Sequence, residues 1–335
     1  MRILRHYTEV PAEARGAVVA LGNFDGVHRG HHAVLAAAAA DARRLGRPLA
    51  VLTFEPHPRQ FFAPEAPPFR LTSLRSKAHR LEHLGVDFLF ALHFDRDFSH
   101  KTAQTFVLEV LVQGLQASHL VVGYDFVFGH QRGGGVNVLR YMGDMEGFGV
   151  TVVEPVGSGG EIYSSTRIRQ HLKEARPQDA ADLLGHWWEI DGRVQQGDQR
   201  GRTIGFPTAN LALTDLLVPA HGVYAVRAGV ETADGKLAWY DGVANLGRRP
   251  TFAKQDVLFE VHLFDFAGDL YGAHLRVQLI DFIRPERKFA GLEELKAQIA
   301  ADAAAARAML ADRQNRDSER FAAVLPVVPT RRVGS

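Results

Sequence analysis

The stretch VVALGNFDGVHRGH, residues 18–31, decides the fold of the first half of this chain. Four strand-forming or small apolar residues, Val18–Leu21, lead into a turn that three glycines punctuate, and an alanine-rich segment of helical composition follows at Ala33–Leu45. A strand, a tight turn and a helix in this order place the helix N-terminus beside the end of the strand. Free backbone N–H groups and the positive end of the helix dipole attract phosphate there. We therefore expect a phosphate-binding turn.

Two histidines end this stretch. His28 and His31 lie one helical turn apart, with Gly30 between them. Two imidazoles at this spacing can hydrogen-bond phosphate oxygens that gain charge during group transfer, and a glycine lets the backbone come close to a ligand. A histidine pair is also typical of metal ligands or of an ordinary surface. The flanking strand, helix and glycines favour the phosphate interpretation, and the turn lacks the Gly-x-x-x-x-Gly-Lys-Ser/Thr pattern of a P-loop.

The composition narrows the classes of protein. With 335 residues the chain is long enough for two domains, and a net charge of +1 argues against a strongly electrostatic nucleic-acid binder. The absence of cysteine excludes disulfides, thiolate metal sites and cysteine nucleophiles. No apolar run is long enough to span a membrane, and the N-terminus lacks the apolar core of a signal peptide. We expect a cytoplasmic enzyme that acts on small molecules.

Strand-like and helix-like segments alternate over residues 18–155. Strands are expected at 18–21, 49–54, 88–92, 120–123 and 151–154, and helices at 33–45, 74–84, 102–112 and 136–148. Such alternation predicts an α/β fold, a parallel sheet with helices on both faces. Ligands of these folds bind beyond the carboxyl ends of the strands, which is where the histidine turn falls.

The pattern changes after about residue 185. Short strands are expected at 222–230, 238–244, 257–264 and 275–280, and Leu292, Leu295 and Ile299 follow at helical spacing. This indicates a compact antiparallel barrel with a C-terminal helix. We place the domains at 1–184 and 185–325, with a helix over Gln178–Leu184 after Pro177. Residues 326–335 are expected to be a disordered tail.

The string GNFDGVHRGH, residues 22–31, resembles the corresponding turn of nucleotidylyltransferases. Over its full length it is similar to the bacterial family of bifunctional riboflavin kinase/FAD synthetases. The FAD synthetase activity of this family is also called FMN adenylyltransferase. The resemblance implies a Rossmann-like nucleotidylyltransferase domain at the N-terminus and a six-stranded type of antiparallel barrel, the riboflavin kinase domain, at the C-terminus.

Three further segments fit the first domain of that family: TFEPHP at 53–58, GYDFVFG at 123–129 and SSTRIR at 164–169. We expect Ser165 and Thr166 to cap a helix and Arg169 to clamp phosphate, although a capped helix with a solvated arginine explains this segment as well. The resemblance implies that His28, His31 and Arg169 act on the ATP phosphates. It places ATP at Gly22, Phe24, Asp25, Gly30, Ser165 and Thr166. It places the flavin at Phe54, Pro56, Pro58, Phe62 and Asp125.

The second domain contains GRVQQGDQRGRTIGFPTANL at 192–211, which resembles riboflavin kinases. ATP is expected at Gly197, Arg200, Gly201, Arg202, Gly205 and Pro207. In an extended strand Thr208 and Asn210 point to one face, where a hydroxyl and an amide oxygen suit Mg²⁺. Glu260 aligns with the glutamate of the family that takes the proton of the riboflavin 5′-hydroxyl. The ordinary alternatives are a loop before a barrel strand and a glutamate on its exposed face.

Together these segments predict an enzyme of FAD biosynthesis. It phosphorylates riboflavin to FMN with ATP and Mg²⁺, then transfers AMP from a second ATP to FMN, which gives FAD and pyrophosphate. Small molecules are the expected partners, with transient transfer of flavin to apo-flavoproteins, and neither nucleic acid nor membrane. Three alternatives stay open: a nucleotidylyltransferase for another phosphate, such as a pantetheine or nicotinate derivative; a flavin-binding protein that has lost catalysis; and a chain in which one activity is weak.

Overall fold

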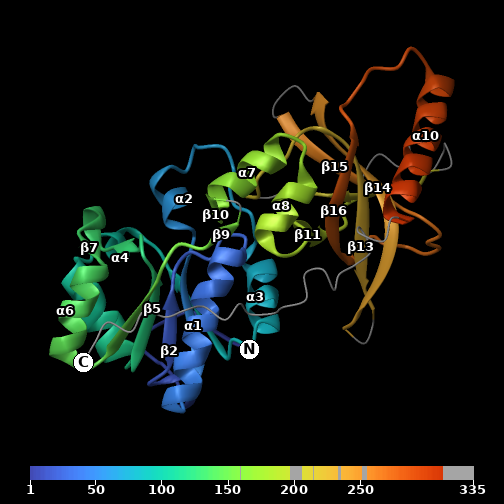
Figure 1. Cartoon of the computed structure of the whole chain (residues 1–335). Helices are drawn as coiled ribbons and strands as arrows, with labels where there is room; N and C mark the ends of the chain where they lie inside the picture. The colour runs from blue at the N-terminus through green and yellow to red at the C-terminus, as the bar shows by residue number, and fades with distance from the viewer. Residues whose placement is uncertain (159, 197–205, 214, 233–234, 251–254, 312–335) are drawn as a thin grey trace. The chain divides into compact units, whose positions relative to one another are not determined.

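The computed structural model describes residues 1–311 except 159, 197–205, 214, 233–234 and 251–254 (Figure 1). The chain forms two compact units. The N-terminal unit comprises residues 1–66 and 77–163, and the C-terminal unit comprises residues 67–76 and the described residues from 164 onward. Two expectations lie outside the described residues: the tail at 326–335, and the part of the kinase loop that holds Gly197, Arg200, Gly201, Arg202 and Gly205.

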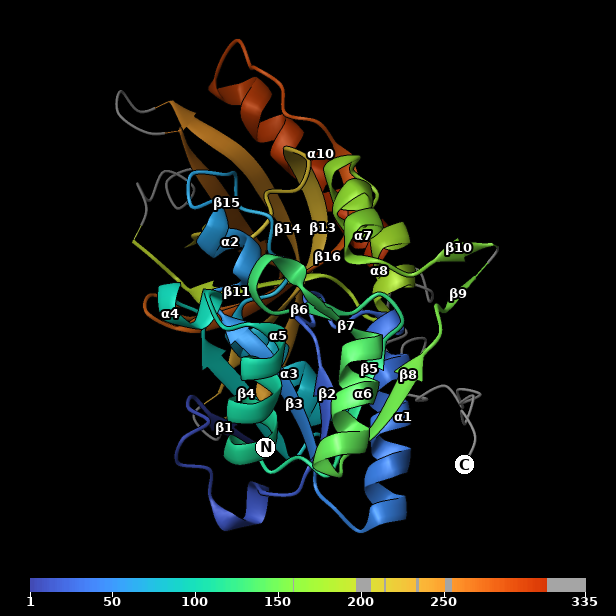
Figure 2. The ribbon, with the colours of Figure 1, turned by 90° about the vertical axis from the view of Figure 1, so that its left-hand side faces the viewer.

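The N-terminal unit is built on a six-stranded sheet in the order β1-β4-β3-β2-β5-β8, and all of its pairings are parallel. Its strands are β1 (Arg2–Leu4), β2 (Val18–Leu21), β3 (Leu49–Glu55), β4 (Phe88–His93), β5 (His119–Gly123) and β8 (Gly149–Val153). The parallel sheet is therefore confirmed, and β1 adds a short edge strand that the sequence pattern did not indicate. Because β2 lies between β3 and β5, the turn that follows it is near the middle of the sheet edge (Figure 2).

Helices connect these strands. They are α1 (Arg29–Leu45), α2 (Pro58–Phe62), α3 (Leu74–His83), α4 (Arg96–Ser99), α5 (Ala103–Thr105), η2 (Phe106–Gly114) and α6 (Val136–Glu146). The helix expected at 102–112 is confirmed by α5 and η2 together, and α5 passes directly into η2, which is a π-helix. The wider turn of a π-helix brings Phe106, Val107, Val110 and Leu111 together into the core.

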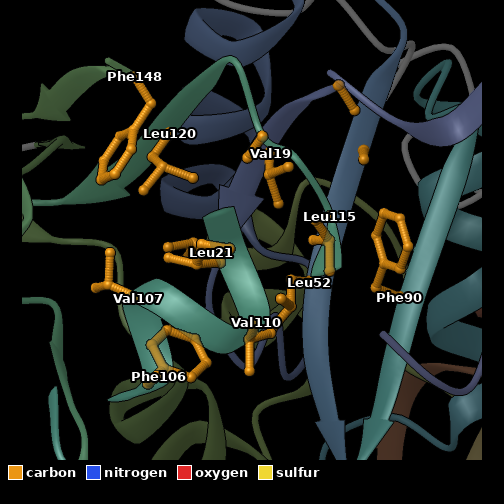
Figure 3. Close-up of a cluster of buried hydrophobic side chains, with 14 of the residues drawn as sticks. Val19, Leu21, Leu52, Phe90, Phe106, Val107, Val110, Leu115, Leu120 and Phe148 are labelled. Carbon is orange, nitrogen blue, oxygen red and sulfur yellow. The ribbon is translucent and has the colours of Figure 1, made fainter. Parts of the chain in front are cut away.

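The side chains of β2 alternate between the two faces of the sheet. Val19 and Leu21 belong to a buried cluster with Phe106 of η2 and with apolar residues of β3, β4 and β5 (Figure 3). Val18 and Ala20, which are fully buried, point to the opposite face, where the alanine-rich α1 packs on β2 and β5. The expected helical layers on both faces of the sheet are thus confirmed.

The C-terminal unit is a six-stranded antiparallel sheet in the order β11-β16-β13-β14-β15-β12. The strands are β11 (Glu189–Arg193), β12 (Ala209–Leu211), β13 (Gly222–Glu231), β14 (Leu237–Pro250), β15 (Gln255–Leu263) and β16 (His274–Arg284). An antiparallel bridge between Gln195 and Asn210 links the chain after β11 to β12, so the sheet nearly closes into the predicted barrel. The short β11 was not among the strands expected from the pattern.

Helices α7 (Ser165–Lys173), α8 (Pro177–Leu184) and α10 (Leu292–Ala311) complete this unit, and α10 packs on β13, β14 and β16 (Figure 1). Short segments complete the secondary structure: η1 (Ala12–Ala14), η3 (His130–Arg132), and the two-residue strands β6 (Val127–Phe128), β7 (Gly134–Gly135), β9 (Gly157–Ser158) and β10 (Glu161–Ile162). Among the described residues, none of these helices combines the length and hydrophobicity that crossing a membrane requires.

A buried ion pair fastens α10 to the barrel. Asp302, which is 4% exposed, accepts hydrogen bonds from Nε and Nη2 of Arg284 at 2.9 and 2.6 Å, and a third at 2.7 Å from Gln298. Removing one partner of such a pair leaves the other charge without compensation. A second pair between the same helix and the barrel region, Arg307 with Asp265, lies on the surface.

We expect Asp302→Ala to lower the free energy of unfolding of the C-terminal unit by about 3 kcal/mol. Tryptophan fluorescence during urea denaturation measures this change, because all three tryptophans belong to the C-terminal unit. Asp265→Asn is the matched control and should hardly move the midpoint, since exposed pairs contribute little. Equal effects of the two substitutions would contradict the role of the buried pair.

Candidate active sites

The N-terminus of α1 is capped by a histidine. The Nδ1 atom of His28 accepts hydrogen bonds from the backbone N–H groups of Gly30 and His31, at 3.1 and 3.4 Å. In return, Nδ1 of His31 accepts the backbone N–H of His28 at 3.2 Å. This reciprocal capping box explains why α1 begins at Arg29, four residues before the helix expected at Ala33, because the cap satisfies donors that a helix start otherwise leaves exposed.

The capping box also fixes the chemistry of both imidazole rings. The rings of His28 and His31 stack with centroids 3.7 Å apart and planes 21° from parallel. Since each Nδ1 accepts a backbone proton, the proton of each neutral ring must be on Nε2. Each ring therefore has an Nε2–H group that can donate to a phosphate oxygen, and the structure brings the two predicted catalytic histidines together.

The other predicted residues of this turn surround the histidine pair. Phe24 is 1% exposed, and its ring centroid lies 5.0 Å from that of His31, while Asp25 is 3% exposed. A Cβ atom on Gly30 would lie 3.0 Å from the imidazole of His28 and 3.3 Å from a backbone carbonyl oxygen. A side chain at position 30 would therefore require these neighbours to shift by a few tenths of an ångström. Burial lowers the pKa of the neighbouring His32 to about 4, so this ring stays neutral at pH 7.

An aromatic cluster lies where β3 and β4 end. Phe54 packs against Phe94, Phe98 and Phe106, with ring centroids 5.7, 5.4 and 6.3 Å apart. The predicted flavin residue Phe62, which is 67% exposed, reaches the cluster through Phe94 at 5.8 Å. Aromatic walls of this kind suit a flat ring system. Phe94 and Phe98 were missed in the sequence, where they occur singly among polar residues after β4.

The remaining predicted flavin residues occupy the same edge of the N-terminal sheet. Pro56 follows the cis peptide bond Glu55-Pro56 at the end of β3, and Pro58 begins α2. Asp125 is exposed just after β5, and its Oδ1 atom would lie 3.3 Å from a Cβ atom on Gly123. Because β3, β2 and β5 are adjacent and parallel, their carboxyl ends meet at one edge.

Arg169 lies on α7, in the C-terminal unit, so its action beside the histidines stays a prediction. Its Nε atom donates to the carbonyl oxygen of Phe69 at 2.8 Å, and its guanidinium lies 5.3 Å from the centre of the Phe69 ring. The expected caps Ser165 and Thr166 are wrong as caps. Ser164 caps α7, because it is the last residue with extended backbone angles and its hydroxyl accepts the N–H of Arg167.

The predicted kinase residues meet on the barrel. In the antiparallel register Glu260 of β15 lies opposite Asn210 of β12 on one side and opposite Asn245 of β14 on the other. Residues in register share a face of the sheet. The neighbours of these three residues along each strand are buried, whereas the three themselves are partly exposed. The structure thus forms a polar row, Asn210–Glu260–Asn245, on the outer face of the barrel, and Asn245 is a member that sequence reasoning did not assign.

The chain just before β12 is held in place by β15. The carbonyl oxygen of Pro207 is 2.8 Å from Nδ1 of His262, whose ring packs edge-on against Phe206. Burial alternates through residues 208–211, so the predicted metal ligands Thr208 and Asn210 lie on the same side of the chain. His262 is therefore a second unassigned residue of this site, and it positions the backbone that leads to Thr208.

A hollow adjoins these residues. Its lining includes Pro207 and Thr208, and most of the other residues that line it have apolar side chains. Those other residues are Val194, Ala209, Val261, Leu263, Phe266, Gly268, Asp269, Leu270 and Tyr271. A pocket with both apolar and polar surface, beside a hydroxyl group that suits a metal–phosphate complex, can take the base of a nucleotide. The loop 266–271 was not singled out in the sequence, because nothing in its composition indicates that it lies beside Thr208.

Comparison with known proteins gives two matches in sequence order. Residues 10–167 match the family model of FAD synthetase, and residues 184–310 match that of riboflavin kinase. A crystal structure of a macrolide-efflux protein from Streptococcus pneumoniae superimposes with a TM-score of 0.79 at 32% identity, over 91% of this chain and 98% of that chain. That likeness concerns the fold, and the activity in its name is said of the pneumococcal protein alone.

Curated relatives match over nearly their full length. The bifunctional riboflavin kinase/FMN adenylyltransferase of Escherichia coli K12 is 45% identical over 307 residues, 92% of this chain and 96% of the relative. That of Pseudomonas fluorescens is 44% identical over 317 residues, 94% of this chain and all of the relative. That of Bacillus subtilis is 39% identical over 299 residues, 88% and 92% of the two chains. This chain belongs to the family of bifunctional riboflavin kinase/FMN adenylyltransferases.

Proposed function

We propose that this chain makes FAD from riboflavin in two ATP-dependent steps. The C-terminal barrel phosphorylates riboflavin to FMN, and the N-terminal unit transfers AMP from ATP to FMN. The observation that carries the first step is the row Asn210–Glu260–Asn245 on the outer face of the barrel. The observation that carries the second step is the stacked histidine pair at the N-terminus of α1.

Adenylyl transfer needs alignment and charge stabilisation rather than a protein nucleophile. The phosphate of FMN attacks the α-phosphorus of ATP, and pyrophosphate leaves. The Nε2–H groups of His28 and His31, together with the helix dipole of α1, stabilise the negative charge that grows on the phosphate oxygens. Phe54, Phe62 and Phe94 would form one wall for the isoalloxazine ring, and Arg169 would bind the polyphosphate.

Phosphorylation of riboflavin requires that its 5′-hydroxyl lose a proton as it attacks the γ-phosphorus of ATP. Glu260 accepts this proton, and ADP leaves. Asn210 and Asn245 lie beside Glu260 and can orient its carboxylate or the substrate hydroxyl. The hollow at 266–271 would receive the adenine of ATP, whose phosphates then extend toward Thr208.

The donor set of the kinase site fits Mg²⁺. The hydroxyl of Thr208 and the amide oxygen of Asn210 are hard oxygen ligands, and they lie on one side of the chain next to Glu260. When bound there, the ion supplies positive charge to the phosphates of ATP.

The matches to the family models support a functional division near residue 184, with the adenylyltransferase at 1–184 and the kinase at 185–325. We also propose that the enzyme works in the cytoplasm and delivers its flavins to apo-flavoproteins. A nucleotidylyltransferase for a different phosphate would not need a riboflavin kinase domain, which the match over residues 184–310 indicates. A flavin-binding protein without catalysis would have no need of the His28–His31 pair or of Glu260.

His28→Ala and His31→Ala should each lower the rate of FAD formation from FMN by about 100- to 1000-fold, because each removes one donor to the charged phosphate. Chromatographic separation of riboflavin, FMN and FAD during turnover measures the rate, and FMN should still accumulate from riboflavin. His28→Asn keeps a capping group but lacks the imidazole donor, so it should also lose FAD synthesis. The control His83→Ala removes an exposed histidine of α3. Near-normal FAD synthesis in the His28 and His31 variants would refute the assignment.

Glu260→Gln should slow FMN formation by about 100-fold or more, because the amide cannot accept the proton of the 5′-hydroxyl. The same variant should convert added FMN to FAD at the normal rate. Glu293→Gln, which alters an exposed glutamate of α10, is the control. The role of Glu260 as the base is wrong if the glutamine variant phosphorylates riboflavin as fast as this control.

A further inference from the structure

A buried lysine contacts the histidine turn. Lys77 of α3 is 2% exposed, and its Nζ atom donates to the carbonyl oxygen of Asn23 at 2.7 Å and to Oγ1 of Thr53 at 3.3 Å. Thr53 is fully buried in β3, and its hydroxyl donates to the same carbonyl at 3.1 Å. The carbonyl of Asn23, at the start of the turn between β2 and α1, is therefore held by two side chains from outside the turn.

The turn held in this way is strained. Phe24 and Val27 have positive φ angles of 48° and 43°. Residues other than glycine rarely adopt such angles, and β-branched residues such as valine do so least of all. Such backbone angles persist only where surrounding contacts impose them. The turn ends at His28, so its conformation sets where the capping box and the stacked imidazoles lie.

Stability alone does not explain an ammonium group at this position. Burying a charge is costly, and an apolar side chain of similar size is often no less stabilising in the same place. What the ammonium provides is a strong, directed hydrogen bond to the Asn23 carbonyl and a positive charge behind a turn that is expected to bind polyphosphate. Both effects act on the group-transfer site.

We propose that Lys77 is a positioning residue for adenylyl transfer. Its buried ammonium holds the Asn23 carbonyl, and thereby keeps the 22–28 turn in the strained conformation that presents His28 and His31 to the phosphates. This inference rests on the proposed adenylyltransferase function. The assay of the unmodified chain tests that function separately: failure of the unmodified chain to make FAD contradicts the function, whereas the variants below test Lys77.

Lys77→Met keeps the length of the side chain but removes its charge and hydrogen bonds. We expect kcat for FMN adenylylation to fall by about 100-fold, the loss that a small misplacement of reacting groups produces, while KM for ATP changes far less. The rate of riboflavin phosphorylation in the same sample should stay normal, because Glu260 and its neighbours belong to the other unit. Lys101→Met is the matched control, since Lys101 also pairs with a side chain of the N-terminal unit, Glu109. Thr53→Val, a milder change, should give a smaller loss of the same kind.

The chain offers a specific rescue because it has no cysteine. Lys77→Cys can be alkylated with 2-bromoethylamine in denaturant and refolded, which rebuilds a lysine-like ammonium at this position only. We expect the treatment to restore FAD synthesis in this variant and to leave the unmodified chain unchanged. Two-bond ¹H–¹⁵N spectra of the imidazoles supply a separate readout: in Lys77→Met, His28 and His31 should no longer show the proton on Nε2 alone.

Three results would overturn the proposal. Lys77→Met could keep the kcat of Lys101→Met, or it could lose both activities equally, which would make Lys77 a general stabiliser of the fold. Alkylated Lys77→Cys could stay as slow as the untreated variant, which would show that the ammonium is not what the turn requires. If Lys77→Met does not fold, Thr53→Val decides in its place. A loss of adenylylation with normal phosphorylation then supports the proposal that hydrogen bonds to the Asn23 carbonyl position the turn, and unchanged adenylylation refutes it.

Discussion

The reciprocal cap between His28 and His31 is the interaction on which the N-terminal site depends. Helices usually begin with a short side chain whose oxygen accepts a backbone N–H, whereas here two imidazoles perform this task for each other. The same hydrogen bonds that start α1 fix the orientation of both rings and put the proton of each neutral ring on Nε2. The same two rings therefore serve the helix through Nδ1 and, in the proposed mechanism, phosphate transfer through Nε2.

The two units place their functional groups by different means. In the parallel sheet the groups gather at strand ends, because adjacent parallel strands finish at one edge and their loops converge there. Phe54 after β3, His28 after β2 and Asp125 after β5 follow this rule. In the barrel the groups lie along strand faces, because antiparallel register brings Asn210, Glu260 and Asn245 side by side in the middle of three strands.

Strain and its support are found together in the histidine turn. The left-handed backbone angles of Phe24 and Val27 are unfavourable in isolation. Beside them, the side chains of Lys77 and Thr53 both donate hydrogen bonds to the carbonyl oxygen of Asn23. A rigid turn of this kind can present donors to phosphate without rearrangement during the reaction. In the C-terminal unit a side chain likewise holds a backbone carbonyl, because His262 donates to the carbonyl oxygen of Pro207 next to Thr208.

Residue patterns alone predicted the architecture of both halves, which the structure confirms, and they indicated most of the candidate reactive groups. Continuous apolar runs identified the parallel strands at 18–21, 49–54 and 88–92, and the strings around His28 and Glu260 carried their chemistry. These features are local, because strand periodicity and motif spacing are properties of neighbouring residues. The strands β1 and β11 escaped detection, since Arg2–Leu4 and Glu189–Arg193 mix charged with apolar residues and contain no continuous apolar run.

The tertiary structure decided which distant side chains act together. Phe94 in the aromatic wall, Asn245 beside Glu260, the apolar loop at 266–271 and the buried Lys77 all join their sites through contacts far apart in the chain. It also decided that Ser164 rather than Ser165 caps α7, and that histidines cap α1. Caps, register and burial depend on backbone angles and on packing between elements, which no local pattern of residues specifies.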